Sequence, residues 1–291
     1  MLELKNENLE IQIDSPGAVY NQSRFDWTGQ ISQIIFNELH HFCTTETNDE
    51  KLRSTRGIGL CNEFGISTPV GYDECPVGAY FLKIGTGMLL KESNEAYDFF
   101  KTYKVKPAEF KVQQENHSSV SIETKASDKR GYAYKFIKQY SITSNTLSIH
   151  CVLENVGSKD IITEEYCHNF LCIDKKLVDN SYRLSFDCKI NQNDFTNLVN
   201  PNECMIVSSE GMTWQSIPES DFFISNVGKV ASWKLENTKS KVSISESVDF
   251  VPTYCNLWGK GHVISPELFK EINIKPGQKA DWTRKYTFNH L

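Results

Sequence analysis

A histidine in the middle of the chain lies where a strand could present it to a ligand. The segment EEYCHNF, residues 164–170, is predicted to end a β-strand. Successive side chains of a strand point to opposite faces, which places Tyr166, His168 and Phe170 on one face and Glu165, Cys167 and Asn169 on the other. An imidazole titrates near neutral pH, so it suits general acid–base chemistry. The alternative for His168 is a sheet histidine that only makes a structural hydrogen bond.

A glutamate near the C-terminal end, Glu267 in VISPELF, is the second candidate for chemistry. A carboxyl group whose pKa is raised by partial burial can exchange a proton with a hydroxyl group at neutral pH. A histidine and a glutamate carried by different strands of one sandwich can then work as an acid–base pair across a small ligand. The alternative for Glu267 is a solvated carboxylate at the start of a helical turn.

Further polar and aromatic residues are candidates for binding a ligand. Arg24 and Asp26, in SRFDWTGQI at 23–31, are predicted to share one face of a strand. The planar donors of an arginine suit hydroxyl groups or an anion, although a surface ion pair is the alternative. Asn169 follows His168 at the strand end. Trp258, in the loop CNLWGKGH before Glu267, is expected to offer an aromatic face.

Period-two alternation runs through the chain and predicts the elements that position these residues. Leu147, Ile149, Cys151 and Leu153 fall on one face of a strand, and Leu9, Ile11 and Ile13 on one face of another. Such alternation, broken by turns such as NVGS and KPGQ, is typical of antiparallel sheets with one packed face. Two short helices are predicted, over 93–103 and 266–272. The fold class predicted is all-β, with residues 1–291 as one domain of two stacked antiparallel sheets.

Composition excludes several classes of protein. The net charge is −6, which argues against nucleic acid and against an anionic membrane as partners. No run of about 18 apolar residues and no apolar signal segment is present, and the nine cysteines have no regular spacing. These features predict a cytoplasmic protein with reduced thiols. The histidines lack metal-binding spacing, so we expect no catalytic metal.

Two segments together resemble the galactose mutarotase-like (aldose 1-epimerase) family. In 144–174, a strand, an Asn-containing turn and a second strand lead to the pair of His168 and a nearby aromatic residue. In 262–288, Glu267 precedes the Pro276–Gly277 turn and a final strand that ends in Tyr-x-Phe. The resemblance covers residues from about 20 to 288. It implies a large antiparallel β-sandwich, the supersandwich, with a sugar cleft on one sheet.

The resemblance also implies site residues. His168 corresponds to the family's general acid and Glu267 to its general base, and the two are expected to lie about a sugar ring's width apart. Asp221, in ESDFF, matches the aspartate of a sugar-binding Asp-His-aromatic motif in which Phe222 here replaces the histidine. A turn aspartate is the alternative. Glu63, in GIGLCNEFGI, lies roughly where the family carries an arginine.

The function implied by the resemblance is that of an aldose 1-epimerase, or mutarotase, which interconverts the anomers of an aldose without a cofactor. Glu267 would take the proton of the C1 hydroxyl while His168 protonates the ring oxygen, and the ring would then open and reclose. Fold alone does not select this activity. The alternative is a non-catalytic carbohydrate-binding protein on the same fold.

Overall fold

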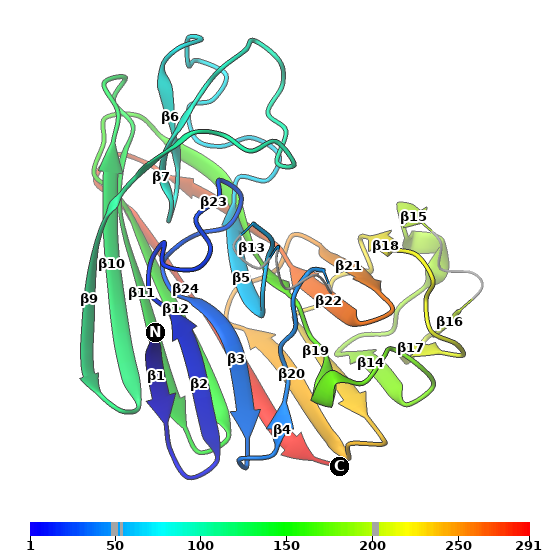
Figure 1. The fold of residues 1–291 in the computed structure, drawn as a ribbon. Helices are drawn as coiled ribbons and strands as arrows, with labels where there is room; N and C mark the ends of the chain where they lie inside the picture. The colour runs from blue at the N-terminus through cyan, green and yellow to red at the C-terminus, as the bar shows by residue number, and fades with distance from the viewer. Residues whose placement is uncertain (48–51, 53–54, 200–203) are drawn as a thin grey trace.

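The computed structural model describes residues 1–47, 52, 55–199 and 204–291 (Figure 1). Its architecture is two large sheets packed face to face, with two smaller sheets beside them. Every strand pairing within the described residues is antiparallel, as the sequence pattern predicts. The strands are joined mostly by turns, together with the short 3₁₀ segments η2 (Ile173–Lys175) and η3 (Gln192–Asp194).

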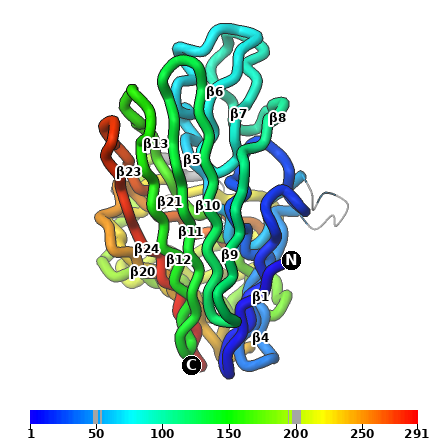
Figure 2. The backbone as a smooth tube through the Cα atoms, turned by 90° about the vertical axis from the view of Figure 1, so that its left-hand side faces the viewer, coloured from blue at the N-terminus to red at the C-terminus, as the bar shows by residue number. Residues whose placement is uncertain are grey.

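The larger sheet contains ten strands and forms the broad wall seen in Figure 2. Its order is β16 (Met205–Ser208), β17 (Gly211–Trp214), β14 (Tyr182–Phe186), β19 (Ser232–Asn237), β20 (Val242–Val248), β24 (Lys279–His290), β12 (Thr146–Asn155), β11 (Ala133–Thr143), β10 (Ser119–Ser127) and β9 (Glu109–Asn116). The last strand of the chain, β24, therefore lies inside this sheet, between β20 and β12.

The second large sheet contains seven strands. Its order is β1 (Leu2–Lys5), β2 (Leu9–Asp14), β3 (Gln30–Phe36), β5 (Leu60–Phe64), β13 (Ile161–Asn169) and β23 (Lys270–Ile274), with β4 (His40–His41) attached to β3. Strand β1 lies beside the β9–β10 hairpin (Figure 2), where the side chain of Gln114 donates to the carbonyl of Glu3 at 2.8 Å. This contact joins the two large sheets along one edge.

Two smaller sheets flank the second large sheet. One has the order β15 (Asn197–Val199), β18 (Phe222–Ser225), β21 (Cys255–Lys260) and β22 (Val263–Leu268). The other consists of β6 (Tyr80–Lys83), β7 (Gly87–Leu90) and β8 (Val105–Pro107). A bridge between Leu171 and Ile264 brings β22 alongside the end of β13. That neighbourhood positions the candidate site.

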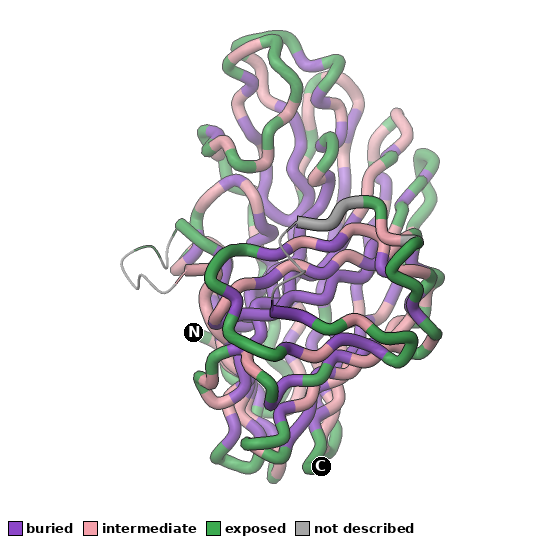
Figure 3. The backbone as a smooth tube through the Cα atoms, turned by 90° about the vertical axis from the view of Figure 1, so that its right-hand side faces the viewer, coloured by how far each residue is buried: buried purple, intermediate pink, exposed green. Residues whose placement is uncertain are grey.

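The core lies between the two large sheets, and buried segments run through the centre of the molecule in Figure 3. Strand β12 alternates strictly between buried and partly exposed residues, so the predicted face of Leu147, Ile149, Cys151 and Leu153 is confirmed. Each such buried aliphatic side chain contributes about 1.5–3 kcal/mol to folding. All nine cysteines are free, as predicted, and all except Cys188 are buried.

Buried charges connect the inner faces of the two sheets. On the ten-stranded side, Lys138 donates to Asp26 at 3.1 Å and to Asn62 at 2.6 Å. Further along, Arg284 donates to Glu246 and to Glu165, each at 2.8 Å. Buried ions need such partners because removal from water penalises the charged form. The inner face beneath the candidate site is therefore a layer of paired buried charges, in which Nε of Arg284 alone among the atoms of these ion pairs in the described residues has no hydrogen-bond partner.

The helix predicted over 93–103 is wrong. The segment forms bends and a turn, and the side chain of Asp98 accepts the backbone N–H of Phe100 at 2.9 Å. Aspartate often competes with helix formation in this way. Tyr97 and Tyr103 stack with their ring centroids 5.3 Å apart, which fixes the segment in an aromatic cluster.

The helix predicted over 266–272 is also wrong, because these residues form the end of β22 and the start of β23, with Phe269 between the two strands. Pro266 lies within β22, opposite Leu257 of β21. A proline has no N–H to donate to a sheet, so it is tolerated in a strand only where no partner needs that N–H. The alternation of β22 places Ser265 and Glu267 on one face and Ile264, Pro266 and Leu268 on the other.

Candidate functional site

Three strands meet at the outer face of the seven-stranded sheet and bring the predicted pair together. Tyr166 and His168 share one face of β13, as predicted, and this is the outer face of the sheet. Glu63 lies opposite Tyr166 on β5. Glu267 comes from β22, whose bridge to the end of β13 sets it against His168. Residues 99 positions apart in the sequence thus share one site because two strand ends are neighbours.

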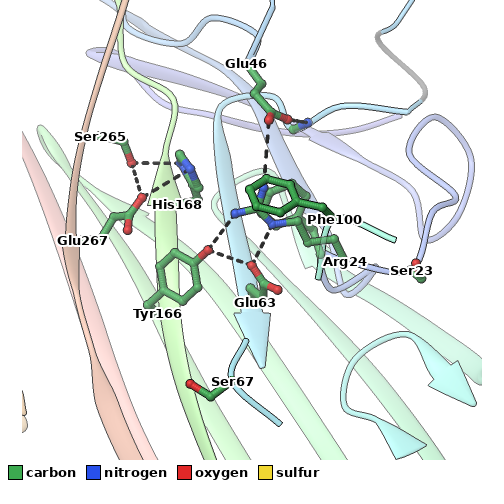
Figure 4. A network of polar contacts seen from close by, with 12 residues as sticks. Ser23, Arg24, Glu46, Glu63, Ser67, Phe100, Tyr166, His168, Ser265 and Glu267 are labelled. Atoms are coloured by element: carbon green, nitrogen blue, oxygen red, sulfur yellow. Dashed lines mark hydrogen bonds and ion pairs between the residues drawn. The ribbon is translucent and has the colours of Figure 1, made fainter. Parts of the chain in front are cut away.

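His168, Ser265 and Glu267 form a triangle of polar contacts (Figure 4). The Nε2 atom of His168 lies 3.3 Å from Oε1 of Glu267. The hydroxyl of Ser265 lies 2.9 Å from Nδ1 of His168 and donates to the same Oε1 at 3.0 Å. The expectation that the pair would lie a sugar ring's width apart is wrong, because the two groups are in direct contact.

Burial sets the protonation of this pair. His168 is 5% exposed and Glu267 is 4% exposed. Removal from water raises the pKa of Glu267 to about 8, with Ser265 and Arg24 acting in the opposite direction. Burial, and then the charge of Arg24, hold the pKa of His168 well below its ordinary value. At neutral pH the contact is therefore between a carboxylic acid and a neutral imidazole rather than an ion pair.

Aromatic rings surround His168. Phe170 stacks on the imidazole with 3.9 Å between ring centroids, and Trp258 approaches it edge-on at 5.2 Å. Phe25 closes another side at 6.0 Å, and Phe269 stacks on Tyr166 at 4.3 Å. Trp258, which is expected from the sequence to offer an aromatic face, thus lies beside His168.

Arg24 faces His168 from the other side of the site (Figure 4). Its Nε donates to Glu63 at 2.9 Å, and its Nη2 donates to the hydroxyl of Tyr166 at 3.1 Å. The Tyr166 hydroxyl in turn donates to Glu63 at 2.7 Å, and the buried Nζ of Lys83 lies 3.5 Å from the same carboxylate. Glu63 is fully buried, so it positions Arg24 rather than facing solvent.

A cavity of about 170 Å³ lies next to Arg24 and Phe25. Phe99, Phe100 and Lys101, from the segment predicted as a helix, line its far side. The guanidinium of Arg24 lies over the rings of Phe25 and Phe99 at 4.6 and 4.8 Å. Arg24 and Phe25 therefore separate this cavity from the His168–Glu267 pair.

Two residues predicted to bind substrate, Asp26 and Asn169, lie in the core and not in the site. Residues 23–28 form no strand, and Asp26 turns away from Arg24 to bind Lys138 in the core, where it is 1% exposed. Asn169 is also fully buried, and its amide donates to the carbonyl of Pro266 at 2.6 Å. Because alternation directs it to the inner face, Asn169 supports β22 from beneath.

Asp221 lies at the rim of the candidate site. Its carboxylate lies 4.0 Å from Nζ of Lys260, and its side chain is 61% exposed. Lys260 itself lies over the ring of Trp258 at 5.5 Å. Asp221 therefore lies at the rim of the site, next to Lys260 on the Trp258 side.

Three further residues of the site were not predicted from the sequence: Ser265, Tyr166 as a polar partner, and Lys83. The signal for Ser265 was present, since it stands two residues before Glu267 and would share its face in a strand. Because a helix was predicted over 266–272, Ser265 and Glu267 were not expected to share a face. For Lys83 the sequence offers no local signal, because only tertiary packing brings it to Glu63.

The described residues contain no group of three or more His, Cys, Asp or Glu side chains arranged to hold a metal ion. Within the same residues, no helix is long and apolar enough to cross a membrane. The site is thus assembled from hydrogen-bonding, ionic and aromatic side chains.

The fold is that of the galactose mutarotase-like proteins. A galactose mutarotase-like protein from Lactobacillus casei has a TM-score of 0.64 at 14% identity, covering 99% of this chain and all of its own. A galactose mutarotase related enzyme from Lactobacillus acidophilus has a TM-score of 0.62 at 12% identity, covering 99% and 96% of the two chains.

An aldose epimerase homologue from C. elegans has a TM-score of 0.58 at 12% identity, covering all of this chain and 98% of its own. No family model matches the sequence, and no curated protein matches it. At these identities the likeness extends to the fold, while activity has to be argued from the site.

Proposed function

We propose that this protein is an aldose 1-epimerase-like enzyme that interconverts the anomers of an aldose by acid–base ring opening and closure. The observation that carries the proposal is the 3.3 Å contact between Nε2 of His168 and Oε1 of Glu267. A mutarotase needs one group to accept a proton and another to supply one at the same sugar. A carboxylic acid in contact with a neutral imidazole meets both needs.

The reaction is a redistribution of protons. One group takes the proton of the C1 hydroxyl as the bond between C1 and the ring oxygen breaks, and the other gives its proton to that oxygen. Rotation about C1–C2 and the reverse transfers yield the other anomer, with the pair restored. No oxidation state changes, so the proposed reaction calls for no cofactor. The proposed partner is a free aldose.

In this proposal, the residues around the His168–Glu267 pair bind the sugar. Trp258 stands edge-on to His168 and offers a flat surface to a sugar face. The Nη1 atom of Arg24 lies 3.9 Å from Glu46, the loosest of its polar contacts, which leaves it available to a hydroxyl group. Asp221 at the rim remains a candidate for a distal hydroxyl.

A non-catalytic carbohydrate-binding protein is the second candidate. The observation that favours it is the near-complete burial of both reactive groups, neither of which is more than 5% exposed. Arg24 is moreover already held by Glu63 and Tyr166. A binding protein would capture a sugar at the Trp258 side without reaching the pair.

Anomer exchange on a panel of free hexoses and pentoses, followed by NMR exchange spectroscopy or polarimetry, separates the two candidates. We expect catalysed exchange, and we expect His168→Ala and Glu267→Gln each to slow it about 10²–10⁴-fold. The two losses should not add in the double variant, because ring opening needs both transfers.

His150→Ala is the matched control, since His150 lies on the ten-stranded sheet with 42% of its side chain exposed. It should keep full activity. Sugar binding with exchange no faster than in buffer would establish the binding protein instead.

A further inference from the structure

A second hollow lies apart from the candidate site, beside β4 at the lower end of the seven-stranded sheet in Figure 1. This groove has a volume of about 1300 Å³, whereas the cavity next to Arg24 has about 170 Å³. Within the described residues, its lining includes neither member of the His168–Glu267 pair nor Arg24. We call it the β4–η2 groove and define it by six of its lining residues: Ile35, Leu39, His40, Lys175, Lys176 and Leu177.

A turn in an unusual backbone conformation forms one wall of the groove. Asp174 and Lys175, in η2, have φ angles of 53° and 55°, in the left-handed region that residues other than glycine seldom adopt. The Asp174 carboxylate lies 2.9 Å from Nδ1 of His40 and accepts the backbone N–H of His41 at 2.9 Å. Burial opposes its ionisation, but hydrogen bonds from Ser240, His40 and His41 lower the pKa of Asp174 overall. Because these contacts hold the turn, the residues after Asp174 are presented to the groove.

Positive charge predominates in the groove, although the whole chain carries a net charge of −6. Among the described residues that line it, three are lysines, and the carboxylate of Asp174 is the one negative group. The ammonium of Lys239 lies 2.6 Å from the carboxylate of Asp179. Lys175 and Lys176 form no ion pair within the part of the chain that the structure describes. Two cationic side chains therefore face the groove without a carboxylate partner there, a pattern that favours an anionic ligand.

The two lysines keep N–H groups available for such a ligand. Lys176 is half-buried, and its Nζ donates one hydrogen bond, to the hydroxyl of Ser240 at 2.9 Å. An ammonium group has three donors, so two remain on Lys176, and Lys175 beside it offers its own. Phosphate oxygens accept several charge-assisted hydrogen bonds at once, and lysine is a common ligand of phosphate. The donors therefore suit a phosphate group.

Aliphatic side chains in the groove indicate that the ligand also has an organic part. Leu39 and Leu177 are 67% and 49% exposed, and Ile35 and Ile58 line the groove as well. A phosphate ion alone would leave these side chains in water. The volume of the groove exceeds the range of about 300–1000 Å³ that is usual for small-molecule sites. Space and apolar contacts are thus present for an organic group joined to the phosphate.

We propose that the β4–η2 groove is a second binding site, separate from the His168–Glu267 site, and that it takes a small phosphate monoester. The ammonium groups of Lys175 and Lys176 bind the phosphate, and Leu39 and Leu177 contact the organic part. A phosphate monoester is favoured over a carboxylate because its charge of about −1.5 to −2 at pH 7 matches two lysines. The inference is independent of the proposed anomer exchange, since neither reactive group of that reaction lines the groove.

Isothermal titration calorimetry of the whole chain at pH 7 and constant ionic strength tests the proposal with three probes: phenyl phosphate, inorganic phosphate and phenol. We expect phenyl phosphate to bind most tightly, inorganic phosphate more weakly, and phenol not measurably. Lys175→Met and Lys176→Met should each weaken both phosphate probes about tenfold, because each removes a hydrogen bond to a charged group. Leu177→Ser should weaken phenyl phosphate and leave inorganic phosphate unchanged.

Lys285→Met is the matched control. Lys285 is an exposed lysine of β24, on the ten-stranded sheet, and it likewise forms no ion pair within the described residues. Its substitution should leave the affinity for each probe unchanged, and so should His168→Ala, which alters the candidate sugar site. NMR of the imidazole rings should show that phenyl phosphate shifts the signals of His40 but not those of His168.

Four results would overturn the inference. The first is the absence of phenyl phosphate binding to the natural protein. The second is an equal loss in Lys285→Met, which would indicate general electrostatic attraction. The third is a loss in His168→Ala, which would place the ligand in the sugar site instead. The fourth is equal affinity for phenyl phosphate and inorganic phosphate, which would show that the groove does not bind the organic part.

Discussion

Glu267 shows how much a single residue depends on what surrounds it. The same carboxyl on the surface would be ionised at neutral pH, whereas in this site burial raises its pKa to about 8. The neighbouring histidine is driven in the opposite direction by the same cause, since burial disfavours its charged form. At neutral pH the two groups thus form a contact between a carboxylic acid and an imidazole, both of them uncharged.

Because the pKa of Glu267 is raised by folding, this residue should make stability depend on pH. Between its ordinary pKa and about 8, the folded chain holds a proton on Glu267 that the unfolded chain has lost. The free energy of unfolding therefore falls as pH rises through this window, by up to about 1.4 kcal/mol per pH unit. Glu267→Gln stays neutral at every pH and should lack this decline.

The measurement is urea unfolding of the natural protein and Glu267→Gln at pH 6, 7 and 8. The variant should gain stability relative to the natural protein as pH rises. Lys83, whose pKa burial lowers to about 8, titrates in the same range with the opposite effect. It is common to both proteins and cancels in the difference. Parallel pH dependence of the two proteins would contradict the burial argument.

At the scale of elements, one alternating strand serves the site and the core at once. The outer face of β13 carries Tyr166 and His168, while its inner face carries Glu165, Cys167 and Asn169. The inner residues meet an ionic layer rather than a purely apolar one. Asn62 on β5 donates to Glu165, and its carbonyl oxygen accepts from Lys138. The orientation of the site strands therefore depends on pairs that lie beneath them.

Substitutions of Lys138 and Asp26 test how much this ionic layer contributes to the free energy of unfolding. Lys138→Met should lower the free energy of unfolding by about 3–5 kcal/mol, because it leaves the buried carboxylate of Asp26 without its cationic partner. The double variant Lys138→Met, Asp26→Asn should lose less than the sum of the single variants. Lys135→Met is the control, since Lys135 is on the same strand with its side chain 38% exposed, and its effect should stay within about 0.5 kcal/mol.

Urea unfolding measures all four variants. Additive losses in the double variant would show that Lys138 and Asp26 are not coupled. Asp26→Asn should also leave the KM of any sugar unchanged if the residue belongs to the core. A raised KM would indicate that Asp26 contributes to sugar binding.

At the scale of the whole molecule, the chain closes its fold with its last strand. Strand β24 pairs with β12 on one side and β20 on the other, and it contributes Trp282, Tyr286 and Phe288 to the core. The core cluster takes residues from β1 through β24. Distant parts of the sequence thus share one interior, and we propose that residues 1–291 behave as a single domain.

Deleting β24 should therefore abolish folding altogether, whereas deleting the edge strand β1 should only reduce stability. Removal of a central strand exposes the ladder groups of both neighbours, while an edge strand has one neighbour. Circular dichroism and tryptophan fluorescence during urea unfolding of the full chain should give coincident transitions. Two separate transitions, or a stable proteolytic half, would show that the chain contains independent units.

Much of this protein was determined by its sequence through local rules. Alternation with period two fixed which residues of 164–170 share a face and which strands have a packed side, because adjacent residues of a strand always point in opposite directions. The free state of the cysteines followed from their number and spacing. These features depend on the backbone over a few residues, so they can be read without knowing what packs against them.

Only the tertiary structure decided the site itself. The contact between His168 and Glu267 depends on β22 lying beside the end of β13, a pairing that no local pattern specifies. The same packing made 266–272 strand instead of helix and sent Asp26 and Asn169 into the core. It also placed Ser265 between the two reactive groups. Periodicity acts between near neighbours in sequence, whereas the register of distant strands is set by how well whole faces pack together.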